Sequence, residues 1–221
     1  MSARLARRAA LAGLMALAAG AAMAQGGKVV PAGKVFVYLE SFLKVPAQER
    51  SRTRVTYALL RDGKPAGGVK ATLVEASGAR TPLPIASDGR FERVPTLAQL
   101  QGDAKIEFEA PADAKFGLNM KIEPVLKPAP EYDVAELRAV VDSTNRVIGK
   151  AAGPMALLAP KMAGLAFPGA ASGVAVGADG KTEPLPVEDK SPVFRPSDFK
   201  SATRIRLSAT PSRVVFAQGK K

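Results

Sequence analysis

Residues 50–64 read RSRTRVTYALLRDGK, and this stretch decides the fold class. Its polar and apolar side chains alternate, with Val55, Tyr57 and Leu59 on one face. Alternation over this length predicts a strand with one buried face. Asp62-Gly63 follows at once, and this dipeptide readily adopts the positive φ angles of a tight turn. The stretch therefore predicts a strand that turns back into an antiparallel sheet.

Further short strand-like runs lie on both sides of this strand, each bounded by turn residues. They cover residues 34–39, 69–75, 81–85, 90–94, 105–109 and 117–125. Two prolines restrict residues 81–85 to an edge strand or an extended loop. Short strands at this spacing predict an antiparallel β-sandwich over residues 34–126, preceded by a flexible Gly-rich arm at residues 25–33.

A Pro-rich break at residues 127–131 separates this sandwich from a helical segment at residues 132–168. Asp133 is a suitable N-cap for the first helix. The apolar stripe of that helix consists of Val134, Leu137, Val140, Val141, Val147 and Ile148. Pro154 suits the first turn of a second helix that continues to about Met162. We therefore expect two helices over about residues 133–163.

The remaining residues, 169–217, predict more strands. Asp179-Gly180 favours a hairpin between residues 174–176 and 182–187, and residues 205–209 and 213–216 have the pattern of closing strands. We expect these strands to rejoin the first sheet, which gives one α+β, mainly β domain with a helical excursion. The alternative is two subdomains joined at the break of residues 127–130.

Two turns in the first half carry a family resemblance. Gly63-Lys64-Pro65 precedes the strand at Val69, and Ser87-Asp88-Gly89-Arg90-Phe91 precedes a later one. Over about residues 52–110 this pattern resembles the prealbumin-like modules typified by carboxypeptidase regulatory-like domains. The resemblance implies a β-sandwich with a structural or binding accessory role and no catalysis of its own. The helical segment has no counterpart in such modules.

The N-terminal 24 residues have the features of a secretory signal peptide. Arg4, Arg7 and Arg8 form a basic start, an apolar run follows, and Ala22-Met23-Ala24 places small residues before a cut. We expect cleavage after Ala24 and export to a periplasm or to the outside of the cell. The apolar run is too short to span a bilayer comfortably.

Composition excludes several chemistries. The 221 residues include no Cys, His or Trp, so disulfides, a thiol nucleophile, an imidazole base and common zinc or haem sites are absent. We therefore expect no cofactor and no catalysis. The remaining enzyme class is a carboxylate-dependent hydrolase, whose candidates Glu107, Glu109 and Glu123 are more simply explained as solvent-facing strand positions.

Positive charge is the second compositional signal. The chain has 32 Lys and Arg against 20 Asp and Glu, and cleavage of the leader would leave 29 against 20. In an exported protein this favours anionic envelope components rather than nucleic acid as partners. Candidate anion-binding residues are Arg50, Arg52, Arg54, Arg204 and Arg206. They would form one surface if their strands were neighbours; the alternative is a solvated face that discourages edge pairing.

Residues 151–176 contain a single charge, Lys161. Prolines and glycines interrupt the segment too often for a membrane span. It predicts either a buried cover over a sheet or an exposed surface for a membrane interface or a protein partner. The sequence thus favours a non-catalytic envelope binding or accessory module, with an interaction factor working through residues 151–176 as the alternative. Oligomeric state stays open.

Overall fold

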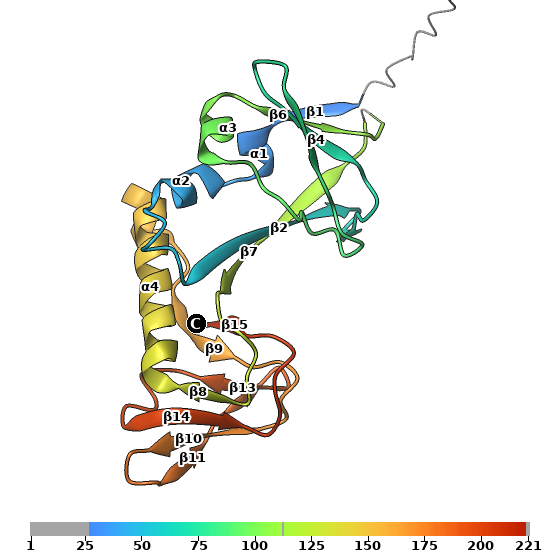
Figure 1. Cartoon of the computed structure of the whole chain (residues 1–221). Coiled ribbons are helices and arrows are strands. Elements are labelled where there is room, and N and C mark those ends of the chain that lie inside the picture. The colour runs from blue at the N-terminus through green and yellow to red at the C-terminus, as the bar shows by residue number, and fades with distance from the viewer. Residues whose placement is uncertain (1–26, 112, 220–221) are drawn as a thin grey trace, which may run out of the picture.

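The computed structural model describes residues 27–111 and 113–219. The predicted signal peptide lies outside these residues. The fold is α+β and mostly strands, with four antiparallel sheets and one long helix. Two hydrophobic clusters divide it into an N-terminal lobe and a C-terminal lobe, with the long helix α4 beside both (Figure 1).

The N-terminal lobe contains two sheets and three short helices. One sheet has the strand order β1-β6-β4-β5: β1 (Lys28–Pro31), β6 (Lys105–Phe108), β4 (Ala71–Val74) and β5 (Arg80–Leu83). The other has the order β3-β2-β7: β3 (Lys64–Pro65), β2 (Thr53–Arg61) and β7 (Phe116–Pro124). The helices are α1 (Ala32–Val35), α2 (Leu39–Lys44) and α3 (Leu97–Gln101).

The turns of this lobe confirm the prediction from Asp-Gly pairs. Asp62 and Gly63 both have positive φ and connect β2 to β3. Gly89 has φ +81°, and a Cβ atom there would lie 2.5 Å from the carbonyl oxygen of Leu59. Only glycine allows this close approach of two backbones. The edge position predicted for residues 81–85 is also confirmed by β5.

The strand expected at residues 34–39 is wrong. This segment forms α1 and the start of α2, and its buried residues are Ala32, Val35, Phe36 and Leu39. Their spacing of i, i+3, i+4 and i+7 is helical. Val37, which the alternating pattern placed inward, is exposed.

The C-terminal lobe also contains two sheets. The order β11-β10-β14-β8 joins β11 (Thr182–Pro184), β10 (Gly173–Gly177), β14 (Ala202–Leu207) and β8 (Glu131–Asp133). The order β12-β13-β9-β15 joins β12 (Val187–Glu188), β13 (Ser191–Phe194), β9 (Met162–Ala166) and β15 (Val215–Gln218). The hairpin predicted around Asp179-Gly180 is confirmed by β10 and β11.

The expectation that the C-terminal strands rejoin the first sheet is wrong. They pair with one another, with β8, which directly follows the Pro-rich break, and with β9. Their buried residues form a cluster separate from that of the N-terminal lobe. The short strand β8, directly before α4, pairs with β14 and begins a C-terminal sheet. The strands after α4 therefore join C-terminal sheets and not those of the N-terminal lobe.

The long helix α4 (Val134–Ala152) packs on both lobes. Asp133 caps it as predicted, because its Oδ1 accepts a hydrogen bond of 2.6 Å from the backbone N–H of Ala135. Leu137 and Val141 enter the C-terminal cluster and Val147 enters the N-terminal one. A buried 2.7 Å hydrogen bond between the hydroxyls of Thr144 and Thr53 fixes the helix to β2.

The second predicted helix is shorter and tighter than expected. It is the 3-10 helix η1 (Gly153–Leu158), after which Met162 begins β9. Residues 151–176 therefore include a buried part and an exposed part. Leu165 and Phe167 are fully buried, whereas Met155, Leu157 and Leu158 of η1 are 60%, 97% and 78% exposed.

Tyr57 gives the fold a sensitivity to alkali. Its ring packs edge-on against Phe36, its Oη donates a 2.7 Å hydrogen bond to the carbonyl of Val37, and burial raises its pKa. The folded state holds the phenol proton more tightly than the unfolded chain, whose tyrosine pKa is about 10. This contribution to stability is complete below pH 10 and is lost as the pH rises above it.

We expect Tyr57→Phe to flatten the fall in unfolding free energy between about pH 10 and pH 12, measured by urea titrations at each pH. Part of the fall remains, because burial also raises the pKa of Tyr132. Loss of the hydrogen bond costs about 1 kcal/mol at neutral pH. An unchanged alkaline slope in the variant would contradict the assignment.

Candidate functional site: a basic cleft between the lobes

A cavity of about 900 Å³ separates the N-terminal lobe from part of the C-terminal lobe. Its first wall is the polar face of β2 and β7 together with the turn at Asp88. Its second wall is the segment around β15, with Pro160 and Met162 beside it. Ligand pockets occur preferentially at such boundaries between folded units. The cleft is therefore the main candidate site of the described chain. We name it the interlobe cleft.

Strand register builds the first wall. β2 and β7 pair with Arg54 opposite Glu123, Thr56 opposite Lys121 and Ala58 opposite Asn119. Because side chains alternate along a strand, these pairs share one face, and Tyr57 and Leu59 enter the core on the other. An isolated bridge from Ala58 to Arg90 adds a third cation to the same wall.

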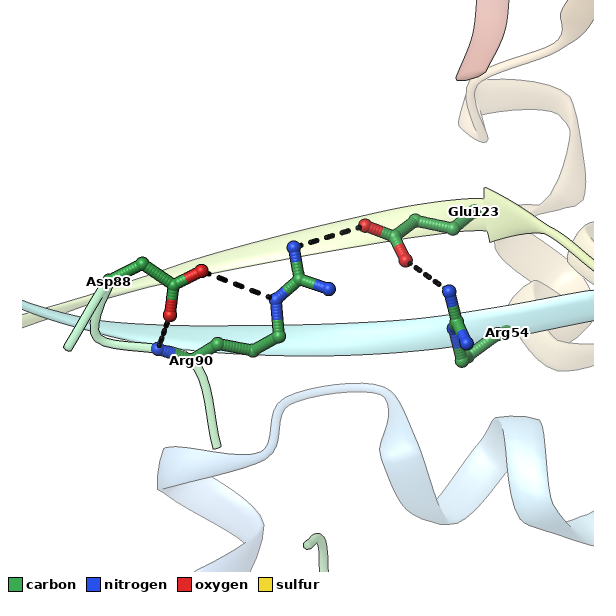
Figure 2. A network of polar contacts seen from close by, with 4 residues as sticks. All are labelled: Arg54, Asp88, Arg90 and Glu123. Atoms are coloured by element: carbon green, nitrogen blue, oxygen red, sulfur yellow. Dashed lines mark hydrogen bonds and ion pairs between the residues drawn. The ribbon is translucent and has the colours of Figure 1, made fainter. Parts of the chain in front are cut away.

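Four of these side chains form a charge ladder (Figure 2). Arg54 Nη2 lies 2.9 Å from Glu123 Oε2, and Arg90 Nη2 lies 3.9 Å from Glu123 Oε1. At the other end, Arg90 Nε lies 3.7 Å from Asp88 Oδ2, and Asp88 Oδ1 accepts a 3.0 Å hydrogen bond from the backbone N–H of Arg90. Both carboxylates of the cleft are thus occupied by arginine.

Lys121 and Arg213 complete the positive charge of the cleft. Lys121 lies on β7 in the first wall, and Arg213 precedes β15 in the second. Within residues 27–111 and 113–219, neither side chain has an ion-pair partner. The cleft is lined by four cations and two carboxylates, and its two free cations come from different lobes.

Apolar and amide groups occupy the rest of the second wall. Val214, Val215, Phe216 and Gln218 line the cleft from β15 and the residues before it. Low-polarity surface next to a cation strengthens its attraction for an anion, since less water screens the charge. The arrangement can hold a carboxylate or a phosphate group, and it offers a neighbouring apolar surface to the rest of the ligand.

The five predicted arginines lie at four separate places. Arg54 lies in the interlobe cleft. Arg50 lies before β2, where its Nε donates to the carbonyl of Val45 and its guanidinium covers the ring of Phe42 at 5.5 Å. Arg52, also before β2, lines a small cavity of about 130 Å³ with Glu49 and Arg146.

Arg204 and Arg206 lie on β14, in a different sheet from β2. The condition for one joint arginine surface is therefore not met. Both pair with Glu131 on β8, at 3.3 Å and 3.2 Å. Hydrogen bonds from Arg206 first and Arg204 second lower the pKa of the Glu131 carboxyl. This carboxylate already balances part of their charge.

Sequence reasoning missed Arg90, Lys121 and Arg213 as site residues. Lys121 lies on the cleft face of β7, but nothing in the local pattern distinguishes it from other solvent-facing lysines. Arg213 lies about 90 residues after Lys121 in the sequence. Only the separate folding of the C-terminal lobe brings these residues to one cavity.

The carboxylates considered for hydrolysis are not grouped together. Glu107 pairs with Arg80, and Glu109 pairs with Lys70 at 3.2 Å. Glu123 lies in another sheet, in the interlobe cleft. Among the described residues, no group of three or more Asp or Glu is arranged to hold a metal ion. In the same part of the chain, no helix is both long enough and apolar enough to cross a bilayer.

Comparison of the chain with protein-family models, with curated proteins and with solved structures finds no match. Any assignment of this chain to a class of protein therefore depends on its two-lobed fold and on the interlobe cleft.

Proposed function

We propose that this protein is a non-catalytic binding protein that holds a small anionic ligand in the interlobe cleft. The carrying observation is the pair of free cations, Lys121 and Arg213, on opposite walls of one cavity. A carboxylate or phosphate between them would contact both lobes at once. The charge ladder supports this role by keeping Glu123 and Asp88 engaged with arginines.

The predicted envelope location and the family resemblance belong to the same proposal. The two N-terminal sheets contribute Tyr57 and Leu59, and Leu73 and Ile106, to one core, which supports a β-sandwich arrangement of that lobe. A sandwich of this kind would serve as the scaffold of a binding module. The ion pairs at Glu107, Glu109 and Glu123 support a role without hydrolysis.

Isothermal titration of the full chain with pyrophosphate and, separately, with citrate tests the proposal. We expect Lys121→Gln and Arg213→Gln each to weaken binding by about tenfold or more, because a hydrogen bond to a charged group contributes about 1.5–3 kcal/mol. The anion that binds more tightly shows whether the site prefers phosphate or carboxylate groups. Raised salt should weaken binding to either.

The doubly substituted Arg204→Gln/Arg206→Gln chain is the matched control. It removes two positive charges from the C-terminal lobe at positions that do not line the cleft, and it should bind within about twofold of the original chain. Equal weakening by this control would show non-specific charge attraction and contradict the proposal. So would failure of the unsubstituted chain to bind either anion at millimolar concentration.

The second candidate function is an interaction factor that works through residues 151–176. The observation in its favour is the exposure of Met155, Leu157 and Leu158 on η1. Large apolar side chains gathered on a surface commonly mark a binding site. The experiment that ends the next subsection separates this function from the first.

A further inference from the structure

A second cavity, of about 400 Å³, lies on the other face of the β2–β7 pair. We name it the apolar groove. The residues that line it come from α2, β2, β7, the end of α4 and η1, and they include Phe42, Val55, Val147, Ile148, Ala151 and Met155. No charged residue of the described chain lines it, and one of its few hydroxyls, that of Thr53, is already bonded to Thr144. The groove suits hydrocarbon.

Exposed apolar side chains surround the groove. Tyr38, Met155 and Leu158 line it and are 70%, 60% and 78% exposed. Tyr38 also has φ +62°, a left-handed conformation that a bulky residue adopts only at a cost in free energy. The exposure of these apolar side chains and the backbone strain at Tyr38 occur at the same cavity, and both favour a binding surface there.

The apolar groove adjoins the interlobe cleft. Met120, Ile122 and Pro160 line both cavities. β7 is the edge strand of its sheet, so among the described residues no strand hydrogen-bonds to its outer side. Lys121 lies between Met120 and Ile122 in the sequence, and its side chain is on the cleft face of the strand.

We propose that the ligand is a single-chain amphiphile with an anionic head group. The head lies in the cleft between Lys121 and Arg213, and the hydrocarbon chain passes around the edge of β7 into the apolar groove. This inference rests on the proposed function, since it assigns the head group to the same cleft. The cations of the interlobe cleft favour an anionic head group, and the uncharged lining of the apolar groove favours a hydrocarbon chain.

Titration of the full chain with butyl, octyl and dodecyl phosphate, each below its micelle concentration, tests the inference. Affinity should rise about fourfold for each added methylene that enters the groove. Met155→Asp and Leu158→Asp should each weaken the binding of dodecyl phosphate by at least tenfold and leave the binding of butyl phosphate unchanged. Both residues are exposed, so these variants are expected to fold.

Leu157→Asp is the matched control, because Leu157 lies between the other two on η1 and does not line the groove. It should bind dodecyl phosphate as the unsubstituted chain does. If affinity depends on Lys121 and Arg213 but not on chain length, the inference is wrong and the proposed function stands. If affinity grows with chain length but is indifferent to both cations, the head-group assignment and the proposed function both fail.

Anionic phospholipid vesicles provide the last arm. Binding to vesicles without binding to monomeric alkyl phosphates, lost equally in Leu157→Asp and Leu158→Asp, would overturn the inference in favour of docking on a lipid surface through η1.

Discussion

Phe36→Ala is expected to lower the free energy of unfolding by about 3–5 kcal/mol, the usual cost of removing a fully buried phenylalanine. Phe36 is 1% exposed and packs edge-on against two other rings, Tyr57 at 5.1 Å and Phe91 at 5.0 Å between centroids. These rings come from three separate segments of the N-terminal lobe. The variant loses both contacts and leaves a cavity among them.

Urea unfolding followed by circular dichroism measures this loss. Phe36→Leu is the control, because it retains most of the volume and should cost only about 1–2 kcal/mol. A loss of less than about 1 kcal/mol in the unfolding free energy of Phe36→Ala would mean that the ring of Phe36, at the C-terminal end of α1, does not contribute to the core as described.

Arg195→Ala should destabilise the C-terminal lobe by about 3 kcal/mol. The Arg195 side chain is only 9% exposed and forms a two-pronged pair with Glu188, Nη1 to Oε1 at 2.9 Å and Nη2 to Oε2 at 2.6 Å. The hydrogen bond with Glu188 raises the pKa of Arg195. Alanine would leave the carboxylate without this partner. The loss falls at the low end of the known range because Glu188 is one-third exposed and water can solvate it.

The double variant Arg195→Met/Glu188→Leu distinguishes a lost pair from lost packing. Apolar residues of similar volume often replace a buried ion pair at little or no cost, and here the buried Arg195 Nε has no hydrogen-bond partner in the described chain. We expect the double variant to be more stable than Arg195→Ala in the same urea assay. Equal destabilisation in both would show that the cost of Arg195→Ala does not come from leaving the Glu188 carboxylate without Arg195.

The pattern of polar and apolar residues was sufficient to predict those helices and strands whose structure depends mainly on their own sequence. Alternation at Val55, Tyr57 and Leu59 predicted β2, and Asp133 with its apolar stripe predicted α4. It failed at residues 34–39, where Val35, Val37 and Leu39 alternate by chance within a helical spacing. The capping box of α3, with Thr96 and Gln99, was a readable signal that the analysis of the sequence missed.

The candidate site depends on contacts that no local pattern carries. Arg90, Lys121 and Arg213 come from segments far apart in the chain, and each alone has the pattern of a solvent-facing residue. The arginines that did stand out in the sequence, Arg204 and Arg206, are balanced by Glu131 on a neighbouring strand. Of the five arginines that the sequence pointed to, only Arg54 lines the interlobe cleft.

The shared helix α4 also determines how a ligand can be held. Its 19 residues form a rod of about 28 Å whose side chains are embedded in both hydrophobic clusters, so it acts as a strut that fixes the aperture of the cleft. Proteins whose halves swing shut on a ligand lose part of the binding energy to that closure. Under the proposed function, α4 would hold Lys121 and Arg213 in place before the ligand arrives, and affinity would come from preorganisation. Small-angle scattering should accordingly find the same radius of gyration with and without a bound amphiphile.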